Sequence, residues 1–305
     1  MNPRRPSPQG PEPCTFDLTW RPPPEPVLFY LCSHICLPAM TMDLIVGTCN
    51  AIARAVSRLS LAESGKVLQR GAGGDFTKMI DLVAEEAAVT HLQESGFRGT
   101  LVSEELGRRQ FGSELLPILI LDPVDGTTNA VRGMNFYAIS MAASRGPRLA
   151  DVFAGVVMEL PTKRTFTAEK GKGAALDAAR IAMPSPPPLK DSLIGVDLNV
   201  QGDRRKLDEI IPLVLGAKHI RNMGSAALEL CLVACGGLDL YVDNRGLLRV
   251  TDIAASCLIL KEAGALVLDL EGSPLDCPID LSERISLIAG AKKICAEALA
   301  IIRRK

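Results

Sequence analysis

Two aspartates, Asp122 and Asp125, directly follow an aliphatic run and are well placed in this sequence to hold a metal ion. The run 118–121 reads as a buried strand, so the two carboxylates that end it would lie a few ångströms apart. Buried carboxylates at such a separation can both ionise only if a cation sits between them. Pro123 fixes the intervening turn, so that the carbonyl of Val124 can point the same way as the two side chains. The stretch therefore predicts a divalent metal site.

The residues that follow predict an anion site beside the metal. Gly126 lets the backbone turn sharply, and Thr127 to Asn129 can then present N–H groups at the start of a short helix, where phosphate oxygens bind. The alternative is an Asx turn that only caps the strand. Such a turn would explain Asp125 and Gly126 but neither Asp122 nor the two threonines. We therefore favour a coupled metal and phosphate site.

Two further acidic segments could complete the metal site. Glu104 and Glu105 end a predicted strand, and a neighbouring parallel strand would bring one of them beside Asp122. A solvated acidic turn is the alternative. Asp252 falls in the first turn of a predicted helix for which Thr251 would be the cap. Acidic residues there commonly only balance the helix dipole. The interpretation of Asp252 as a metal ligand therefore depends on the other candidate carboxylates.

The candidate ligands are oxygen atoms rather than nitrogen or sulfur. None of the three histidines, His34, His91 and His219, has another histidine at ligand spacing. Cys32 and Cys36 flank His34, but two thiols and one imidazole make an incomplete zinc set, and an incidental cluster is the better interpretation. A site built from oxygen alone favours magnesium over zinc.

The composition excludes two classes of partner. Hydrophobic residues make up 47% of the 305 residues, enough for a large core, and 34 basic against 35 acidic residues leave the chain almost neutral. That balance implies no nucleic-acid surface. Apolar runs such as 115–121 and 285–289 are far shorter than the roughly 20 residues of a membrane helix. Nine cysteines without a repeating spacing indicate reduced, buried thiols, as in a cytoplasmic protein.

The N-terminal segment differs from the rest of the chain. Residues 1–26 are rich in proline and have no apolar periodicity, so we expect 1–41 to be a disordered tail. A helical pattern begins only at Met42. A natural start at Met40 or Met42 would make the preceding segment an upstream reading artefact or a dispensable tail.

A proline-rich hinge at 183–192 separates two predicted subdomains. Residues 42–182 would form an N-terminal α+β subdomain with most of the metal ligands, and 193–305 a C-terminal α/β subdomain that completes the site. The apolar periodicity predicts helices at 42–69, 77–95, 204–216, 224–235, 251–263 and 290–303. It predicts strands at 100–103, 116–121, 135–144, 151–159, 163–168, 193–197, 218–221, 238–242, 265–268 and 285–289.

Three acidic motifs in this order resemble the signature of the inositol monophosphatase superfamily: SEE at 103–105, DPVDGTTN at 122–129 and TDIAA at 251–255. The stretches GAGGDFTKMIDLVAE at 71–85 and YVDNRGLLRVTD at 241–252 are similar to its archaeal branch, the dual inositol monophosphatase and fructose-1,6-bisphosphatase enzymes. The resemblance covers 42–305, and the three acidic motifs together are highly specific. It implies an α+β layered sandwich with the order α-β-α-β-α.

The resemblance further implies a hydrolase of phosphate monoesters with two or three Mg²⁺ per site. Glu104, Asp122 and the Val124 carbonyl would hold one ion. Asp122, Asp125 and Asp252 would hold a second, and Glu104 would assist through a further metal. Two metals would neutralise the oxygens of the phosphate dianion, ionise a water for direct attack and receive the leaving alkoxide.

The same likeness suggests which residues act on the water and the phosphate. Asp81 and Thr127 resemble the family's pair that orients and deprotonates the water, although Asp81 alone would read as an exposed helical residue. Backbone N–H groups would cradle the phosphate, and the substrate-binding set would be Asp125, Gly126, Thr127, Gly224, Ser225, Ala226, Asp243 and Arg245. An ordinary helix cap would explain 224–225 equally well. The glycines at 71–74 predict a mobile loop rather than a P-loop.

The archaeal branch implies fructose 1,6-bisphosphate and inositol 1-phosphate as substrates, and a homodimer. A bisphosphate carries a second phosphate away from the metals, which needs its own cation. Arg245 is a better candidate than Arg249 because it follows Asp243 and Asn244 in a turn beside the site, although arginines in such segments are usually just solvated. The tryptophan that often precedes the last aspartate of the family is Thr251 here, which fits the archaeal branch.

Three other functions compete with this interpretation. Phosphatases of the haloacid dehalogenase type place nucleophile and acid two residues apart, whereas Asp122 and Asp125 are three apart. A related 3'-phosphonucleotide phosphatase would share the metal site. A non-catalytic module that binds metal or phosphate predicts damage to at least one motif, and none is visible.

Overall fold

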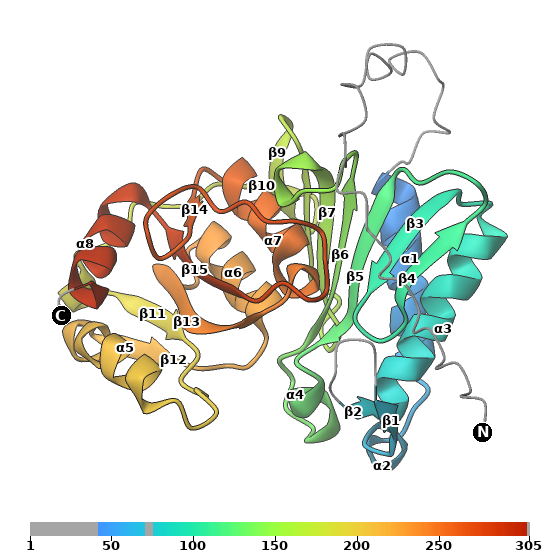
Figure 1. The fold of residues 1–305 in the computed structure, drawn as a ribbon, viewed down its shortest axis with the longest axis horizontal. Helices are drawn as coiled ribbons and strands as arrows, with labels where there is room; N and C mark the ends of the chain where they lie inside the picture. The colour runs from blue at the N-terminus through green and yellow to red at the C-terminus, as the bar shows by residue number, and fades with distance from the viewer. Residues whose placement is uncertain (1–41, 71–75, 304–305) are drawn as a thin grey trace, which may run out of the picture. The chain divides into compact units, whose positions relative to one another are not determined.

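Alternating layers of helix and sheet build the protein in the computed structural model, which describes residues 42–70 and 76–303 (Figure 1). The described residues all belong to one compact unit. The predictions of a disordered tail at 1–41 and of a mobile loop at 71–74 lie outside the described residues.

Two long helices form the first layer. α1 (Met42–Val56) and α3 (Met79–Glu94) pack together and against the first sheet. Ile45 and Ile52 lie on the buried face of α1 and are fully covered, as expected for an amphipathic helix on a core.

The predicted helix over 42–69 is wrong because the helix ends at Val56. Ser60 begins a new helix, α2 (Leu61–Ser64), through a capping box. Its hydroxyl accepts from the N–H of Glu63, whose carboxylate accepts from the N–H of Ser60. The chain then turns into the two-stranded sheet of β1 (Val67–Arg70) and β2 (Phe76–Lys78).

The second layer is an eight-stranded sheet with the order β10-β9-β8-β7-β6-β5-β3-β4. Its strands are β3 (Gly99–Ser103), β4 (Gly107–Phe111), β5 (Ile118–Asp125), β6 (Ala138–Ser144), β7 (Val152–Glu159), β8 (Thr165–Glu169), β9 (Gly173–Leu176) and β10 (Ala179–Ile181). Neighbours are antiparallel except β3 and β5, which run in parallel. The strands β4, β9 and β10 were not predicted, because they lie near the sheet edges, are at most five residues long and each contain at most one buried residue.

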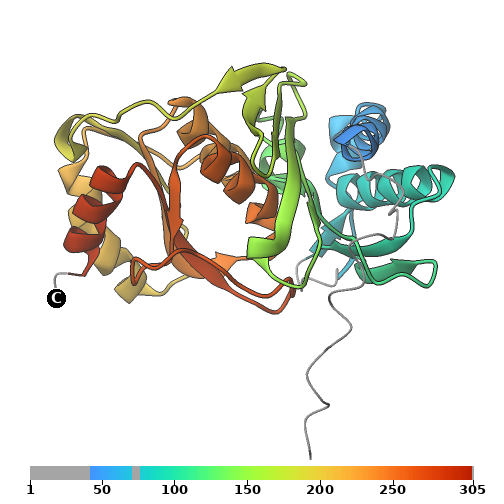
Figure 2. The ribbon, with the colours of Figure 1, turned by 90° about the horizontal axis from the view of Figure 1, so that it is seen from above.

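The third layer consists of α6 (Ala226–Cys235) and α7 (Val250–Glu262), which lie between the two large sheets (Figure 2). Helix α7 packs against β5 to β9 on one side and against β14 and β15 on the other. Nearly all of its residues are buried, as expected for a helix covered on both sides.

The fourth layer is a five-stranded sheet with the order β12-β11-β13-β15-β14. Its strands are β11 (Leu193–Val196), β12 (His219–Arg221), β13 (Leu240–Leu248), β14 (Leu266–Leu268) and β15 (Ile285–Gly290). The outer helices α5 (Arg204–Gly216) and α8 (Lys292–Ile302) cover its far face. The order of layers is therefore α-β-α-β-α, and the predicted fold class is confirmed.

The described cysteines are free thiols, and all of them except Cys235 are buried. Burial raises the pKa of Cys49 and Cys257 to about 12, so these two stay protonated at neutral pH. No helix within 42–70 or 76–303 is long and apolar enough to cross a membrane.

Candidate active site

Glu104 and Asp122 come together because β3, which ends just before Glu104, runs parallel to β5, which contains Asp122. β3 pairs with β5 so that Ser103 lies beside Leu121, and the next residue of each chain segment is the carboxylate. Ligand sites of layered proteins form at such carboxyl ends of parallel strands. The predicted pairing of the two strands is thus confirmed.

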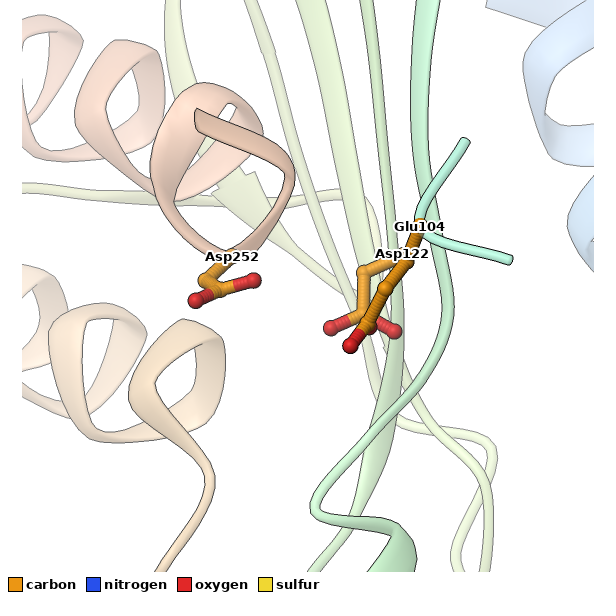
Figure 3. A group of neighbouring side chains, drawn as sticks. All are labelled: Glu104, Asp122 and Asp252. Atoms are coloured by element: carbon orange, nitrogen blue, oxygen red, sulfur yellow. The ribbon is translucent and has the colours of Figure 1, made fainter. Parts of the chain in front are cut away.

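Helix α7 supplies a third carboxylate. Asp252 is its third residue, and its Oδ2 accepts the N–H of the N-cap residue Arg249 at 2.9 Å. This capping box aims the side chain at the strand ends, and carboxylate oxygens of Glu104, Asp122 and Asp252 lie within 4.8 Å of one another (Figure 3). The prediction that Thr251 caps the helix is wrong. It lies inside α7 and donates its hydroxyl to Asp252 at 3.1 Å.

This three-carboxylate cluster carries more negative charge than the neighbouring protein balances. Burial, then repulsion from Glu104, Asp125 and Asp252, raises the pKa of Asp122 well above its usual range. Burial and repulsion from Asp252 raise the pKa of Glu104 to about 8, although the guanidinium of Arg249, which donates to its Oε1, acts in the opposite direction.

A divalent cation fits this donor set. The three ligand atoms are all carboxylate oxygens, which hard cations such as Mg²⁺ prefer. A cation would also remove the mutual repulsion that raises the pKa values of Glu104 and Asp122.

Asp125 lies beside the cluster and is held by the start of α6. Its Oδ2 accepts the hydroxyl of Ser225 at 2.6 Å and the N–H of Ala227 at 2.8 Å. Burial and repulsion from Asp252 raise its pKa to about 7, and these hydrogen bonds oppose the rise. The positive end of α6 therefore faces a carboxylate rather than open solvent.

Two turns from different sheets meet at Gly126. Its φ of +91° is left-handed, and a Cβ there would lie 3.1 Å from the carbonyl oxygen of Gly224. Asn129 joins the same two turns, since its Nδ2 donates to the carbonyls of Phe136 at 2.7 Å and Met223 at 2.6 Å. The backbone N–H of Asn129 donates to Gly126 at 2.9 Å, so the expectation that it is available to a phosphate is wrong.

Asp81 and Thr127 lie in hydrogen-bond contact. Asp81 is the third residue of α3, and its Oδ2 accepts the N–H of Lys78 at 3.0 Å. The Thr127 hydroxyl lies 3.1 Å from Asp81 Oδ1 and 3.0 Å from the carbonyl oxygen of Val124. Asp81 is only 4% exposed, so it is not an exposed helical residue. Burial raises its pKa to about 6.

Gly224 and Ser225 precede α6 and face the site from the second half of the chain. Ser225 is the N-cap of α6, but its hydroxyl bonds Asp125 rather than its own helix. The N–H of Gly224 donates to Oε2 of Glu229 at 3.2 Å. Glu229 is buried, and burial raises its pKa to about 8. Sequence reasoning missed Glu229, although a lone carboxylate in the apolar helix α6 was a usable signal.

Arg245 sits between two carboxylates. Its Nη2 lies 2.5 Å from Asp243 Oδ2 and its Nη1 lies 2.7 Å from Asp197 Oδ2. The side chain of Arg245 is 11% exposed, and that of Asp243 is fully buried. Asp243 also repels Asp252, which places this pair near the three-carboxylate cluster. Asp197 was not among the predicted residues.

The layered fold and the all-carboxylate cluster, of which Asp122 is buried and Glu104 and Asp252 are partly buried, with an aspartate–threonine pair beside it, are typical of a metal-dependent phosphatase. The sequence model of the Inositol monophosphatase family matches residues 39–305. The chain therefore belongs to that family. It is therefore a phosphoric monoester hydrolase, and the predicted family and enzyme class are confirmed.

Relatives and solved structures agree with this membership. The chain is 38% identical over 249 residues to a fructose-1,6-bisphosphatase/inositol-1-monophosphatase of Methanothermobacter thermautotrophicus, across 78% of this chain and 87% of the relative. It is 34% identical to a bifunctional NADP phosphatase/NAD kinase of Methanococcus maripaludis, across 74% of this chain and 42% of that protein. The extragenic suppressor protein SuhB of Bartonella henselae has a similar structure, with a TM-score of 0.75, 28% identity, and coverage of 86% and 98% of the two chains.

Proposed function

We propose that the protein is a Mg²⁺-dependent phosphatase of small phosphorylated sugars and polyols, which hydrolyses fructose 1,6-bisphosphate and inositol 1-phosphate by direct attack of water. The observation that carries the proposal is the cluster of Glu104, Asp122 and Asp252, whose oxygens lie within 4.8 Å of one another. The substrates follow from the name of the relative from Methanothermobacter thermautotrophicus.

Two Mg²⁺ ions would share this cluster. We assign Glu104, Asp122 and the Val124 carbonyl to one ion, and Asp122, Asp125 and Asp252 to the other, with Glu104 also close to a third. Oδ2 of Asp125 accepts from Ser225 and Ala227, so we assign its Oδ1 as the ligand. When bound, the metals supply charge for the phosphate oxygens and the leaving alkoxide and make a water more acidic.

Asp81 and Thr127 would then orient and deprotonate the attacking water. The pKa of Asp81, about 6, keeps its carboxylate mostly ionised at pH 7, as a general base requires. Thr127 has one hydroxyl proton and two acceptors, Asp81 and Val124. It can donate to only one of them at a time, and a lone pair of its oxygen can accept a hydrogen bond from the water, which would orient a lone pair of that water toward phosphorus.

The phosphate would lie against the turns that meet at Gly126. We assign its contacts to Gly126, Thr127, Gly224, Ser225 and Ala226. The N–H of Gly224 donates to Glu229, so that residue would shape the turn rather than donate to the phosphate. Gly126 permits the close approach of these turns because it has no Cβ.

The remote end of the substrate would meet Asp243 and Arg245. Carboxylates accept hydrogen bonds from the hydroxyls of a polyol, whereas a guanidinium suits a second phosphate. Arg245 is already paired with Asp197 and Asp243, so binding a second phosphate would require part of this ion pairing to open. Sugar phosphates with hydroxyls at that end would need no such opening.

The assembly and location follow the family resemblance and the thiols. We propose a homodimer in the cytoplasm, where the described cysteines would stay reduced as the free thiols seen here. Light scattering at several protein concentrations tests the dimer.

Release of inorganic phosphate from a panel of substrates tests the proposed activity. The panel contains inositol 1-phosphate, fructose 1,6-bisphosphate, NADP and a 3'-phosphonucleotide, each with Mg²⁺ and with a chelator. We expect Mg²⁺-dependent release from the first two. Release confined to NADP would favour the activity named for the relative from Methanococcus maripaludis and refute the sugar-phosphate assignment.

A further inference from the structure

A buried carboxylate of α3 holds the turn that carries Glu104. Only three residues join β3 to β4, and Glu104 is the first of them. Oε1 of Glu85 accepts the hydroxyl of Ser103 and the N–H groups of Glu105 at 3.3 Å and Leu106 at 3.1 Å. One oxygen atom therefore binds the turn on both sides of Glu104.

This arrangement has little value for folding alone. Glu85 is only 1% exposed, and its Oε2 has no hydrogen-bond partner among the residues that the structure describes. A buried carboxylate with one unsatisfied oxygen is less favourable for stability than well-packed apolar side chains of similar volume. The carboxyl group instead fixes the orientation of the turn, because one oxygen accepts hydrogen bonds from two consecutive N–H groups.

The same helix face also holds Asp81. Glu85 follows Asp81 by four residues, so both side chains point from one side of α3. Asp81 contacts Thr127, beyond the end of β5, and Glu85 contacts the turn after β3. A single helix thus sets the positions of the pair that serves the water and of the turn with the metal ligand Glu104.

We propose that Glu85 is a positioning residue, which aims Glu104 at Asp122 and Asp252 and thereby sets the affinity of the cluster for a divalent cation. The proposal rests on the proposed function only in assuming that the cluster binds a divalent cation. Outer partners that orient a ligand commonly affect metal affinity by about 10- to 100-fold.

The test is the binding of Mn²⁺ to metal-free protein, followed by electron paramagnetic resonance, in the variant Glu85→Gln. We expect the dissociation constant to rise about tenfold and the Mg²⁺ concentration for half-maximal activity to rise in parallel, with kcat at saturating Mg²⁺ within about threefold of the parent. Glu86→Gln is the matched control, because Glu86 is the next residue of α3 and is exposed. It should leave the dissociation constant unchanged.

Parent-like Mn²⁺ affinity in Glu85→Gln, with only a lower melting temperature, would show a merely structural role and overturn the proposal. If Glu85→Gln does not fold, Ser103→Ala removes one of the three donors to Glu85 and should weaken Mn²⁺ binding by about threefold. Unchanged affinity there overturns the proposal equally.

The outcomes also separate this proposal from the proposed activity. A parent protein that binds Mn²⁺ but releases no phosphate refutes the phosphatase activity and leaves the role of Glu85 open to the binding test. A parent protein that binds no Mn²⁺ refutes both.

Discussion

Replacing Asp81 with asparagine should make the enzyme slower and the metal-free protein more stable. The asparagine can keep the hydrogen bonds: Oδ1 accepts from Lys78, and the amide donates to Thr127, whose hydroxyl turns to Val124. The substitution therefore removes a buried charge without removing the partners that hold the side chain.

The gain in stability follows from the pKa. Asp81 has a pKa of about 6 in the folded protein, against 3.8 as the ordinary value. Because folding raises this pKa, protonated Asp81 contributes stability to the fold. That contribution is complete below pH 3.8 and is lost as the pH rises through about 6. At pH 7 the ionised, buried Asp81 thus destabilises the fold by ~3 kcal/mol, at 1.36 kcal/mol for each pKa unit. Asp81→Asn should recover up to that amount, a rise of roughly 6 °C in melting temperature for a domain of this size.

The loss in rate follows from the role as general base, which typically contributes about 10²- to 10⁴-fold. In the parent, kcat/KM at saturating Mg²⁺ should fall as the pH decreases through about 6, because protonation removes the base. In Asp81→Asn this acid limb should be absent.

Calorimetry of metal-free protein at pH 7 and at pH 4, with a pH profile of phosphate release, measures both effects. Asp43→Asn is the control, since Asp43 is an exposed first-turn aspartate of α1 and should change the melting temperature and the rate little. A rate within about threefold of the parent, or a lower melting temperature at pH 7, would refute the reasoning.

Three more substitutions test other parts of the site. Asp122→Asn should lower kcat more than any other single carboxylate change, because we assign Asp122 to both metals; near-parent phosphate release would contradict that assignment. Arg245→Ala should weaken kcat/KM for fructose 1,6-bisphosphate more than for inositol 1-phosphate, and equal losses on both would count against a contact with the second phosphate. Gly126→Ala should destabilise the protein by about 1–3 kcal/mol from its left-handed backbone and by a further amount from its contact with Gly224. Gly171 has a φ of +80°, and a Cβ there would meet no atom within 4 Å, so Gly171→Ala isolates the backbone effect. Equal melting temperatures of the two variants would show that the contact with Gly224 does not contribute to the loss of stability.

The parts of the site that depend on local sequence could be predicted. The parallel strands that bring Glu104 beside Asp122 follow from two short apolar runs, and the first-turn position of Asp252 follows from the start of an apolar helix. Local patterns also predicted the order of most helices and strands. They failed at the helix over 42–69, where Ser60 caps a new helix, and at strands such as β4 whose residues are mostly exposed.

The parts that depend on distant partners could not be predicted from periodicity. The side-chain amide of Asn129 donates to the carbonyl of Met223, which is 94 residues away along the chain. The carboxylate of Asp125 accepts the hydroxyl of Ser225, which is 100 residues away. The hydrogen bond of Glu85 with Ser103 spans 18 residues and depends on how α3 packs against the first sheet. Such contacts arise only when the layers are assembled, so no spacing in the sequence marks them.

The most direct test of the central claim is the position of the metal. Crystals grown with Mn²⁺ in place of Mg²⁺ should give anomalous scattering peaks within ligand distance of Glu104, Asp122 and Asp252, at roughly 2.0–2.3 Å from their oxygens. Peaks there, lost in Asp122→Asn, are the predicted result. An active enzyme without a peak at this cluster, or with its metal elsewhere, would contradict the account.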